Sequence, residues 1–508
     1  MIDNPCLFHC TIKVYLQCNI LSRRECEGVT LQSLQFTKVN TVYNIQNKLF
    51  FFTDGLYHWN CAWKSQGQSA FFAYRILFPS TVTYGTINYT TTTGRTDKRM
   101  RGYTKVTITR KGEKMARGGH PWVFGDEVLD IAGPVENGDL VDVVSEKKGK
   151  YIGTGFYNDH SKIRVRLLSR NANDKFDEAF FERRLQYALD YRKTVMPGED
   201  FKACRLIFGE ADGFPGLTVD RFNDVLVAQV LSLGMEQRKE LLFTLLLKLL
   251  RDMGEEVKGI YERNDVKIRE LEGLTEGQGI ADISGSTLTE GDLMPIITEN
   301  GLKYRVDVVD GQKTGFFLDQ KYNRLAVSRI CAGKHVLDCF THTGPFALNA
   351  AKGGAASVTA VDISGEALKR ARENFALNGF GEKIQTVEAN VFEYLTELEE
   401  KKQHPFDFII LDPPAFTKSS HTVKSAFRGY KEINLKAMKL LPRGGYLATC
   451  SCSHFMKSEL FVEMLHEAAR DAAVSLRQVE ARQQAPDHPI LYNVPETDYL
   501  KFYIFQVV

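Results

Sequence analysis

Short apolar runs alternate with helical patterns in the carboxy-terminal part of the chain, from about residue 306. The runs HVLDCF, SVTAVDIS, IQTVEA, FDFIILDPP and GYLATCSCS each have the length of a buried strand. The stretches between them, such as EALKRARENFALNGF and the segment near 430–440, have the spacing of amphipathic helices. This alternation predicts an α/β fold with a mostly parallel, doubly wound sheet. In such a sheet, ligands bind at the carboxyl ends of the strands.

A different pattern precedes this region, between about residues 105 and 170. KVTITR, DLVDVVSE, YIGTGFYN and KIRVRLLS alternate or run apolar, and the turn signals ENGD and EKKGK separate them. We therefore expect a small β-rich domain here. Residues 95–175 hold 17 Lys and Arg against 11 Asp and Glu, although the whole chain carries a net charge of only +2. This excess is typical of a solvated basic face and also of a surface that binds a polyanion.

Residues 1–94 differ in composition from the rest of the chain. Eleven of these 94 residues are charged, whereas charged residues make up 25% of the whole sequence, and five of the ten cysteines lie here. The tract TVTYGTINYTTTTG has neither a helical period nor an alternation of buried faces. We expect residues 1–99 to be an atypical extension, either a poorly ordered appendage or an artefact of an upstream reading frame, and assign it no function.

The composition of the 508 residues is that of an ordinary globular protein and predicts two to four compact units. No apolar run approaches the roughly 18–20 residues that span a bilayer, and the first residues do not resemble a signal peptide. We therefore expect a cytoplasmic protein without a membrane partner. The ten cysteines include no CxxC pair, so we expect reduced thiols and no metal site.

Small and polar residues follow the first two strands of the predicted parallel sheet. DCFTHTGPF, residues 338–346, contains Gly344, where the backbone can approach a ligand closely. The second strand ends in Asp362, whose carboxylate can accept hydrogen bonds from both hydroxyls of a ribose. Neither GxGxxG nor a Walker lysine follows, so the pattern supports no dinucleotide and no phosphate cradle. S-adenosyl-L-methionine, which has a ribose and no phosphate, fits both observations.

The fourth strand ends in LDPPAF, residues 411–416. Pro413 and Pro414 fix an extended turn, and the aromatic Phe416 can stack on an extruded base. Asp412 can hold the polar edge of that base. Asp-Pro-Pro is also a good strand terminator in its own right, so the motif alone leaves both interpretations open.

Several segments together resemble the RlmI-like ribosomal RNA methyltransferases. RKGEKMARGGHPWVFGDEV, with GDLVDVV and IRVRLLS, is similar to the amino-terminal PUA domain of that family, a small RNA-binding barrel. RLIFGEADGFPGLTVDRFNDVLVAQV resembles its central domain, and APDHPILYNVPETDYLK resembles its carboxy-terminal end. The resemblance covers about residues 103–508. It implies a PUA-like RNA-binding domain at 103–175, a central α/β domain at 176–300 and a Rossmann-like methyltransferase domain at 301–508.

The resemblance also implies where the cofactor binds. QKTGFFLDQKYNR, residues 312–324, matches the family's cofactor-covering segment. Asn390 stands where relatives commonly carry an Asp that can accept a hydrogen bond from adenine, and its amide oxygen can also accept. The residues expected to bind S-adenosyl-L-methionine are Phe317, Asp319, Gln320, Asp338, Phe340, Thr341, Thr343, Gly344, Asp362, Asn390 and Asp412.

The run TCSCS, residues 449–453, bears on the chemistry. Position 5 of cytosine is a poor nucleophile, so its methylation requires a thiolate that first adds to carbon 6. The resemblance implies that Cys452 is this nucleophile and that Asp412 holds the amino group and ring nitrogen of the cytosine. The residues expected to contact the base are Pro413, Pro414 and Phe416.

Two questions about this chemistry stay open in the sequence. Cys450 lies two residues before Cys452 on the same face of a strand, so it either assists or packs. The base that removes the carbon-5 proton is not identified, and His454 and His488 are the candidates.

The primary prediction is formation of 5-methylcytosine in 23S ribosomal RNA. Relatives with this catalytic domain methylate a ring nitrogen of guanine by direct transfer, which needs no nucleophile and is the alternative. A second alternative is an RNA-binding ribosome-assembly protein with an inactive methyltransferase domain. The sequence leaves open the target nucleotide, the choice between free ribosomal RNA and a pre-ribosomal particle, and whether the protein forms a homodimer.

Overall fold

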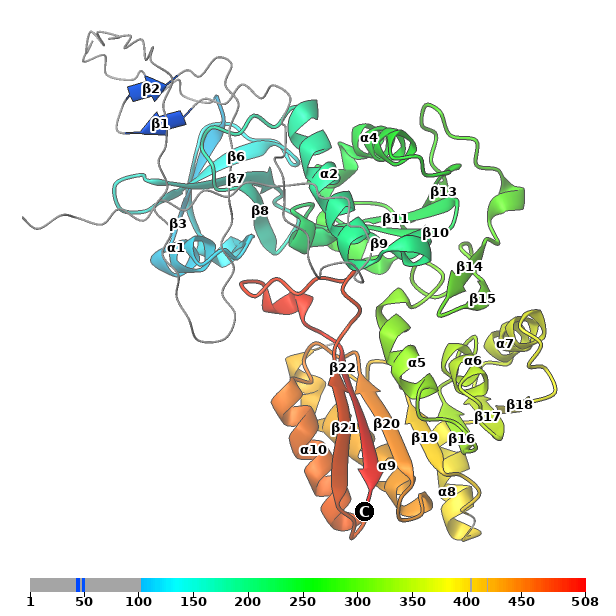
Figure 1. The fold of residues 1–508 in the computed structure, drawn as a ribbon. Coiled ribbons are helices and arrows are strands. Elements are labelled where there is room, and N and C mark those ends of the chain that lie inside the picture. The colour runs from blue at the N-terminus through cyan, green and yellow to red at the C-terminus, as the bar shows by residue number, and fades with distance from the viewer. Residues whose placement is uncertain (1–42, 46–47, 51–101, 403, 418) are drawn as a thin grey trace, which may run out of the picture. The chain divides into compact units, whose positions relative to one another are not determined.

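The structure is a computed structural model that describes residues 43–45, 48–50, 102–402, 404–417 and 419–508 (Figure 1). The chain divides into two units, Met1–Lys98 and Arg99–Val508. The described part of the first unit is an antiparallel pair of strands, β1 (Tyr43–Ile45) and β2 (Lys48–Phe50). The expectation for residues 1–99 therefore falls almost entirely outside the described residues.

A six-stranded sheet begins the second unit. Its strand order is β4-β8-β7-β6-β3-β5, and its apolar side chains, among them Val106, Val143 and Val165, form a separate small core. One helix, α1 (Arg110–Arg117), follows β3 and begins where the Thr109 hydroxyl accepts a hydrogen bond from the Gly112 amide. The strands are β3 (Thr104–Ile108), β4 (Trp122–Phe124), β5 (Val128–Ala132), β6 (Leu140–Ser145), β7 (Tyr151–Tyr157) and β8 (Ile163–Ser169).

The central region contains a five-stranded mixed sheet in the order β13-β12-β11-β10-β9. Alternate residues of β11 face opposite sides, so Leu226 packs with α2 and α4 while Val225 and Val227 face the catalytic region. The strands are β9 (Ala203–Phe208), β10 (Leu217–Phe222), β11 (Val225–Val230), β12 (Gly259–Arg263) and β13 (Gln278–Ile280). The helices are α2 (Glu178–Val195), α3 (Leu233–Glu236) and α4 (Lys239–Asp252).

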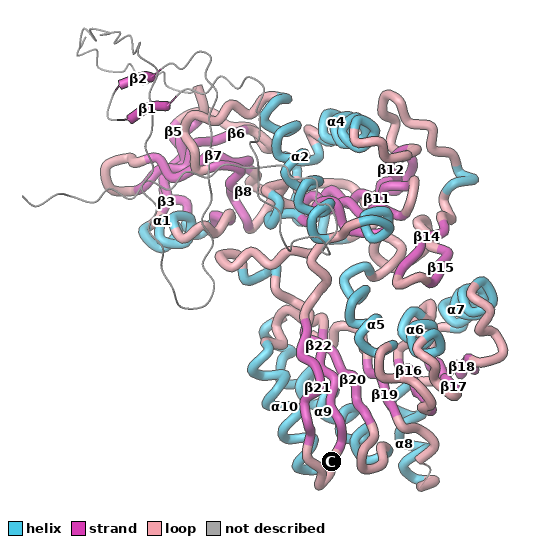
Figure 2. The backbone as a smooth tube through the Cα atoms, in the orientation of Figure 1, coloured by secondary structure: helices cyan, strands magenta, loops and turns pink. Residues whose placement is uncertain are grey.

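Seven strands form the carboxy-terminal sheet, in the order β18-β17-β16-β19-β20-β22-β21 (Figures 1 and 2). Adjacent strands pair in parallel except for β22, which runs antiparallel to both β20 and β21. The strands are β16 (His335–Cys339), β17 (Ser357–Asp362), β18 (Ile384–Glu388), β19 (Phe408–Leu411), β20 (Tyr446–Ser451), β21 (Leu476–Arg482) and β22 (Lys501–Val507). The predicted doubly wound α/β sheet is confirmed.

Helices cover both faces of this sheet. α5, α6 and α7 share one apolar core with Val336 and Ile410, whereas α8, α9 and α10 share another with Leu337 and Ile409. The helices are α5 (Lys321–Ser328), α6 (Pro345–Lys352), α7 (Gly365–Leu377), α8 (Val391–Glu400), α9 (Val423–Leu440) and α10 (Ser458–Asp471). The helix predicted near 430–440 begins at Val423, about two turns earlier than expected.

The central and catalytic regions share one continuous apolar core. Phe222 and Tyr261 of the central sheet belong to the same cluster as Val336 of β16 and Phe346 of α6. The hairpin of β14 (Ile296–Glu299) and β15 (Leu302–Arg305) contributes to this cluster as well. Residues 99–508 accordingly form one compact unit, and the predicted domain boundaries inside it stay predictions.

The loop between β21 and β22 contacts the segment between α1 and β4 and also strand β9 of the central sheet. Asn493 Nδ2 donates to the Gly119 carbonyl at 2.5 Å, and Glu496 pairs with His120 at 3.2 Å. Toward the central region, Asp487 Oδ2 accepts a hydrogen bond from the backbone amide of Arg205 at 2.8 Å. This loop therefore fixes the first sheet and the central sheet to the catalytic one. Within the described residues, no helix is long and apolar enough to cross a membrane.

Candidate active site

The end of β16 places an acid inside the protein. Asp338 is fully buried, and its Oδ2 accepts hydrogen bonds from the Thr341 hydroxyl at 2.6 Å and the Ala347 amide at 2.9 Å. Its Oδ1 is buried without a partner among the described residues, as is the hydroxyl of Thr343. Burial raises the pKa of Asp338 to about 7, with Asp412 adding to the rise.

The backbone of the turn after β16 is unusual at two residues that the sequence singled out. Phe340 has a φ of 62°, and Gly344, just before α6, has a φ of 83°. A Cβ at Gly344 would lie 2.3 Å from the Phe375 ring, so α7 packs directly against this position. Only glycine combines this φ with that close approach.

Two further side chains lie at the ends of neighbouring strands. Asp362, at the end of β17, accepts from the His342 amide at 2.8 Å through Oδ2 and from the Ser364 amide at 3.0 Å through Oδ1. Asn390 follows β18 and caps α8, since its Oδ1 accepts from the Phe392 amide at 3.0 Å. The amide oxygen expected to reach adenine therefore already has one partner and keeps its second lone pair.

Asp412 joins the end of β19 to the segment before α5. Its Oδ1 accepts from Gln320 Nε2 at 3.1 Å and from the Cys450 thiol at 3.0 Å. Burial raises the pKa of Asp412 to about 6. Cys450 is 1% exposed and its thiol also lies 3.3 Å from the Leu411 carbonyl, so it is packed between strands while it contacts Asp412, and both roles considered for it stay predictions.

Cys452 is the more exposed of the two adjacent thiols. It follows β20 directly and is partly buried against the core shared with the central region. Burial raises its pKa to about 11, and Asp412 and Asp319 contribute to the rise, whereas Lys313 and Lys501 oppose it. The thiol therefore lies within electrostatic reach of two predicted site acids and two lysines.

The segment before α5 brings its expected residues to the same place. Asp319 is 5% exposed, and its Oδ2 accepts from the Tyr499 hydroxyl at 2.7 Å while its Oδ1 has no partner among the described residues. Lys313, then His488, lower the pKa of Asp319 to about 2 against the opposing effect of burial. Phe317 lies beside the turn after β16, with its ring 5.4 Å from that of His342 and 4.6 Å from Lys313 Nζ.

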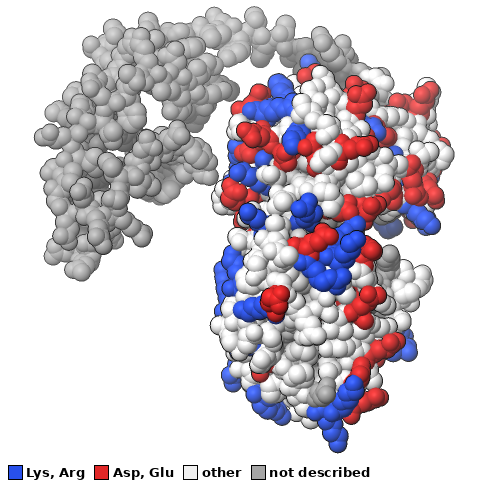
Figure 3. Space-filling model, turned by 90° about the vertical axis from the view of Figure 1, so that its right-hand side faces the viewer, with Lys and Arg blue, Asp and Glu red and all other residues white. Residues whose placement is uncertain are grey.

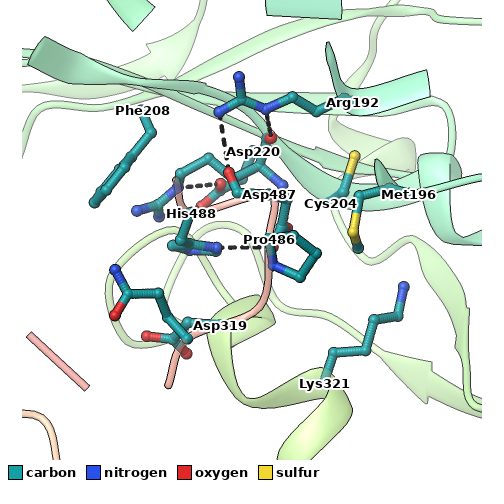
Figure 4. A network of polar contacts seen from close by, with 12 residues as sticks. Arg192, Met196, Cys204, Phe208, Asp220, Asp319, Lys321, Pro486, Asp487 and His488 are labelled. Carbon is teal, nitrogen blue, oxygen red and sulfur yellow. Dashed lines mark hydrogen bonds and ion pairs between the residues drawn. The ribbon is translucent and has the colours of Figure 1, made fainter. Parts of the chain in front are cut away.

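A buried polar network lies next to Asp319 (Figure 4). His488 is held by Asp487, whose Oδ1 is 3.0 Å from His488 Nδ1. Arg192 pairs with Asp212 and also donates to the Asp487 carbonyl at 3.0 Å. Of the two histidines named from the sequence, His488 is thus part of this network, whereas His454 stacks edge-on with Phe455 at 5.4 Å.

The residues after Asp412 differ in their surroundings. Pro413 is buried and Pro414 is exposed. The Phe416 ring lies 4.5 Å from that of Tyr430 and 5.9 Å from that of Phe392, so it packs beside the core under α8 and α9. Phe416 therefore packs against α9, in addition to any contact that it makes with a base.

The strand ends bring most of the predicted residues together. Asp338 and Asp362 are in the last residues of β16 and β17, and Asn390, Asp412 and Cys452 follow β18, β19 and β20 at the same carboxyl edge of the sheet. Lys313, Tyr499 and Lys501 also lie at this edge and were not expected from the sequence. The lysine in QKTGFF and the YLK of the tail were visible, but no spacing rule connects residues so far apart in sequence.

The donors and acceptors at this edge fit a nucleoside-bearing cofactor. Asp338 Oδ1 and Asp319 Oδ1 are buried acceptors without partners among the described residues, and the half-buried Asp362 keeps lone pairs for hydroxyl groups. The five described cysteines are all free, and the described residues contain no group of three or more potential ligands arranged to hold a metal ion.

Basic side chains are not segregated on the surface that Figure 3 shows. Lys and Arg lie interspersed with Asp and Glu over this face. Exposed basic residues of the first sheet region nevertheless include Arg110 and Lys111 on α1, whose partners Glu146, Asp126 and Glu127 lie at 3.4–3.9 Å. The exposed pairs with Glu146 and Asp126 contribute little to stability, and both cations are themselves exposed, so they stay available to a polyanion.

Comparison with known proteins agrees with this geometry. A family model described as S-adenosylmethionine-dependent methyltransferase matches residues 280–505, and one described as PUA-like domain matches residues 106–170. The chain is 39% identical over 410 residues to Ribosomal RNA large subunit methyltransferase I of Klebsiella pneumoniae, covering 80% of this chain and 99% of the relative. It is 42% identical over 395 residues to the protein of the same name from Shewanella denitrificans, covering 76% and 95%.

Solved structures show the same fold. A chain crystallised in complex with SAH superimposes with a TM-score of 0.67 at 21% identity, covering 79% of this chain and 100% of the other. A chain from Streptococcus mutans superimposes with a TM-score of 0.65 at 22% identity, with the same coverage.

The doubly wound sheet, the acids at its carboxyl edge and the two family matches define an S-adenosylmethionine-dependent methyltransferase with a PUA-like domain. The sequence identity of 39% and 42% over nearly the full length of the relatives identifies the family more narrowly than the two domain matches do. The chain belongs to the family of ribosomal RNA large subunit methyltransferase I. The predicted cofactor, S-adenosyl-L-methionine, is confirmed at the level of the family.

Proposed function

We propose that the protein methylates carbon 5 of a cytosine in large-subunit ribosomal RNA, with Cys452 as the nucleophile. The observation that carries this proposal is the position of the Cys452 thiol, at the carboxyl end of β20 and within electrostatic reach of Asp412. The name of the relatives supports ribosomal RNA as the substrate, and the PUA-like match supports binding of RNA by residues 106–170.

Residues at different strand ends contact different parts of the cofactor. Asp362 accepts hydrogen bonds from the ribose hydroxyls, and Asn390 uses the second lone pair of its amide oxygen for adenine. The turn after β16 approaches the cofactor with Thr341, Thr343 and Gly344. When bound, S-adenosyl-L-methionine supplies an electrophilic methyl group on a sulfonium. The residues proposed to hold it are Phe317, Asp319, Gln320, Asp338, Phe340, Thr341, Thr343, Gly344, Asp362, Asn390 and Asp412.

The protein's own groups carry out the chemistry on the base. The Cys452 thiolate forms a bond to carbon 6 of the cytosine, which makes carbon 5 electron-rich enough to take the methyl group. A base then removes the carbon-5 proton, and the bond between carbon 6 and sulfur breaks. Asp412, with a pKa raised to about 6, can carry a proton to the ring nitrogen while it accepts from the amino group. Pro413, Pro414 and Phe416 shape the pocket around the base.

Replacement of Cys452 by Ala should abolish formation of 5-methylcytosine. The variant is incubated with labelled S-adenosyl-L-methionine and protein-free large-subunit ribosomal RNA, and the product nucleosides are separated. Wild type should give labelled 5-methylcytosine, and Cys452→Ala should give none, because the covalent route has no substitute for the thiolate. Cys331→Ala is the matched control, since Cys331 is buried after α5 and donates to the Val327 carbonyl.

The outcomes separate the alternatives. Label in a methylated guanine that persists in Cys452→Ala would identify direct transfer to a ring nitrogen. RNA binding without any affinity for S-adenosyl-L-methionine would instead identify an assembly protein with an inactive methyltransferase domain. Either result would refute the proposed function.

A further inference from the structure

The segment that leads into α5 is fastened to the central sheet through side chains. Arg263, the last residue of β12, donates from Nη1 to the Val308 carbonyl at 3.0 Å and to the Gly311 carbonyl at 2.9 Å. Further along the segment, the Thr314 hydroxyl donates to Oδ2 of Asp220, in β10, at 2.6 Å. The central sheet therefore holds this segment at two places before the chain reaches the residues expected to contact the cofactor.

The carboxylate of Asp220 is itself held rigidly. Asp220 is 0% exposed and stands directly opposite Arg205 where β10 pairs with β9. Arg205 Nε donates to Asp220 Oδ1 at 2.7 Å, and Arg205 Nη2 donates to Oδ2 at 2.8 Å. A guanidinium bound to both oxygens fixes the plane of the carboxylate. Thr314, which is 1% exposed, is therefore tied to an acceptor with one orientation.

The turn that contains Thr314 has a strained backbone. The two residues beside Thr314 have positive φ angles, 54° at Lys313 and 128° at Gly315. A Cβ at Gly315 would lie 2.8 Å from Val306 Cγ1, so glycine is required there. A lysine with positive φ is disfavoured and persists where the surrounding structure over-determines it. The hydrogen bond from Thr314 to Asp220 is such a constraint.

This turn determines where the next residues stand at the site. The exposed Lys313 places its Nζ 4.6 Å from the centre of the Phe317 ring, which in turn lies 5.4 Å from the ring of His342. The Phe317 carbonyl accepts from Arg324 Nη2 at 2.8 Å, and Asp319 follows two residues later. A shift of the turn would therefore move Phe317 and Asp319 relative to the carboxyl edge of the catalytic sheet.

A second buried threonine shows what a purely structural contact of this kind looks like. The Thr154 hydroxyl donates to Asp142 Oδ1 at 2.5 Å, and both residues are buried. That bond joins two directly paired residues of the neighbouring strands β7 and β6 within one sheet. The bond from Thr314 instead joins the central sheet to an irregular segment that adjoins the expected cofactor residues.

We propose that Asp220 is a positioning residue for S-adenosyl-L-methionine, because through Thr314 it holds residues 312–320, the cofactor segment, in the conformation that binds the cofactor. This inference rests on the proposed cofactor contacts of Phe317 and Asp319. Asp220 is buried and acts through Thr314, without a contact of its own to the cofactor. The central region thereby contributes to the affinity for the cofactor.

Thr314→Val tests the contact directly, since it keeps the shape of the side chain and removes the hydroxyl. If the cofactor segment then takes its binding conformation only about a tenth of the time, the apparent affinity falls about tenfold. We expect this loss for S-adenosyl-L-homocysteine by calorimetry. The KM for S-adenosyl-L-methionine should rise while kcat stays nearly unchanged, because saturating cofactor restores the conformation. Thr314→Ser keeps the hydroxyl and should restore wild-type affinity.

Thr154→Val is the matched control, since it removes the same kind of buried bond in the first sheet. It should lower the free energy of unfolding in urea about as much as Thr314→Val does, and it should leave the affinity for S-adenosyl-L-homocysteine unchanged. Wild-type affinity in Thr314→Val would overturn the inference. An equal loss of affinity in Thr154→Val would do the same, because the effect would then be one of general stability.

A measurement on wild type keeps the inference testable if Thr314→Val does not fold. The Gly315 amide donates to the Gln312 carbonyl at 2.9 Å, and its hydrogen exchange should be slow even without cofactor, because the segment is already held. Rapid exchange that slows only when S-adenosyl-L-homocysteine is added would count against the inference.

Two further variants separate this inference from the proposed function. If Phe317→Ala and Asp319→Asn both bound S-adenosyl-L-homocysteine like wild type, the proposed cofactor contacts and this inference would fail together. If both variants bound it more weakly while Thr314→Val bound it normally, only the role of Asp220 would fail.

Discussion

Two buried carboxylates of this site, Asp338 and Asp319, affect the stability of the fold in opposite directions. Asp338 has a raised pKa because burial opposes its charge, whereas Asp319 has a lowered pKa because the charge of Lys313 and the hydrogen bond from Tyr499 favour its charged form against burial. One unit of pKa shift corresponds to about 1.4 kcal/mol. The two acids therefore contribute to the free energy of unfolding with opposite signs.

Asp338→Asn should stabilise the ligand-free protein above neutral pH. The wild-type side chain favours folding fully below about pH 4, and that contribution is lost as the pH rises toward 7, through the folded-state pKa. The Asn oxygen keeps the Thr341 and Ala347 donors. We expect the variant to exceed wild type in unfolding free energy at pH 8 by a few kcal/mol, measured by urea denaturation.

Asp319→Asn is the matched comparison for this prediction. Its depressed folded-state pKa provides stability above about pH 4, which is lost only as the pH falls toward 2, so the variant should be less stable than wild type at neutral pH. If Asp338→Asn and Asp319→Asn changed the free energy of unfolding in the same direction at pH 8, the two acids would not have opposite effects on stability.

At the scale of elements, the turn between β16 and α6 depends on close packing against α7. Gly344→Ala meets two penalties, since the φ of 83° disfavours a Cβ and that Cβ would lie 2.3 Å from the Phe375 ring. We expect a loss of about 2–4 kcal/mol in stability and weaker binding of S-adenosyl-L-methionine by calorimetry, because the turn must shift.

Gly379→Ala separates the two penalties. Gly379 has a similar φ of 73°, but no atom lies within 4 Å of its added Cβ. This variant should lose only the backbone contribution of about 1 kcal/mol and keep its cofactor affinity. If both variants lost the same stability, the Phe375 contact would have no effect.

The five parallel strands β16 to β20 of the catalytic sheet were predictable because they are short, mostly apolar runs, whereas the polar strand β21 and its partner β22 were not predicted. Asp362 and Asp412 could be named as strand ends for this reason. In contrast, α1, β4 and β5 were not predicted, since three to eight residues with mixed polarity give no clear period. The carboxyl-edge residues could be grouped from topology alone, whereas Lys501 and Tyr499 come from β22 and the loop before it, and only the antiparallel register places them.

For the whole molecule, the buried network around Asp487 joins the central sheet to the catalytic one. Asp487 is fully buried, accepts from the Arg205 amide and pairs with His488. Asp487→Ala leaves these donors unpaired in the interior, and we expect a loss of about 3–5 kcal/mol in unfolding free energy by urea denaturation.

The control for Asp487→Ala is Asp471→Ala on α10. Asp471 pairs with Lys431 on the surface, where water replaces the lost partner, so little change is expected. A small effect at Asp487 as well would mean that the central and catalytic regions hold together through their shared apolar core alone.

The position of β22 has a consequence for folding order. β22 follows β21 in the chain, yet it lies between β20 and β21, so these two earlier strands cannot pair with each other in the finished sheet. The hairpin of β21 and β22 is local and forms sooner than its docking against β20, which closes a longer loop. Cys452 and Lys501 meet only at this docking step. The surroundings that act on Cys452, including Lys501, therefore exist only in a molecule whose sheet is complete.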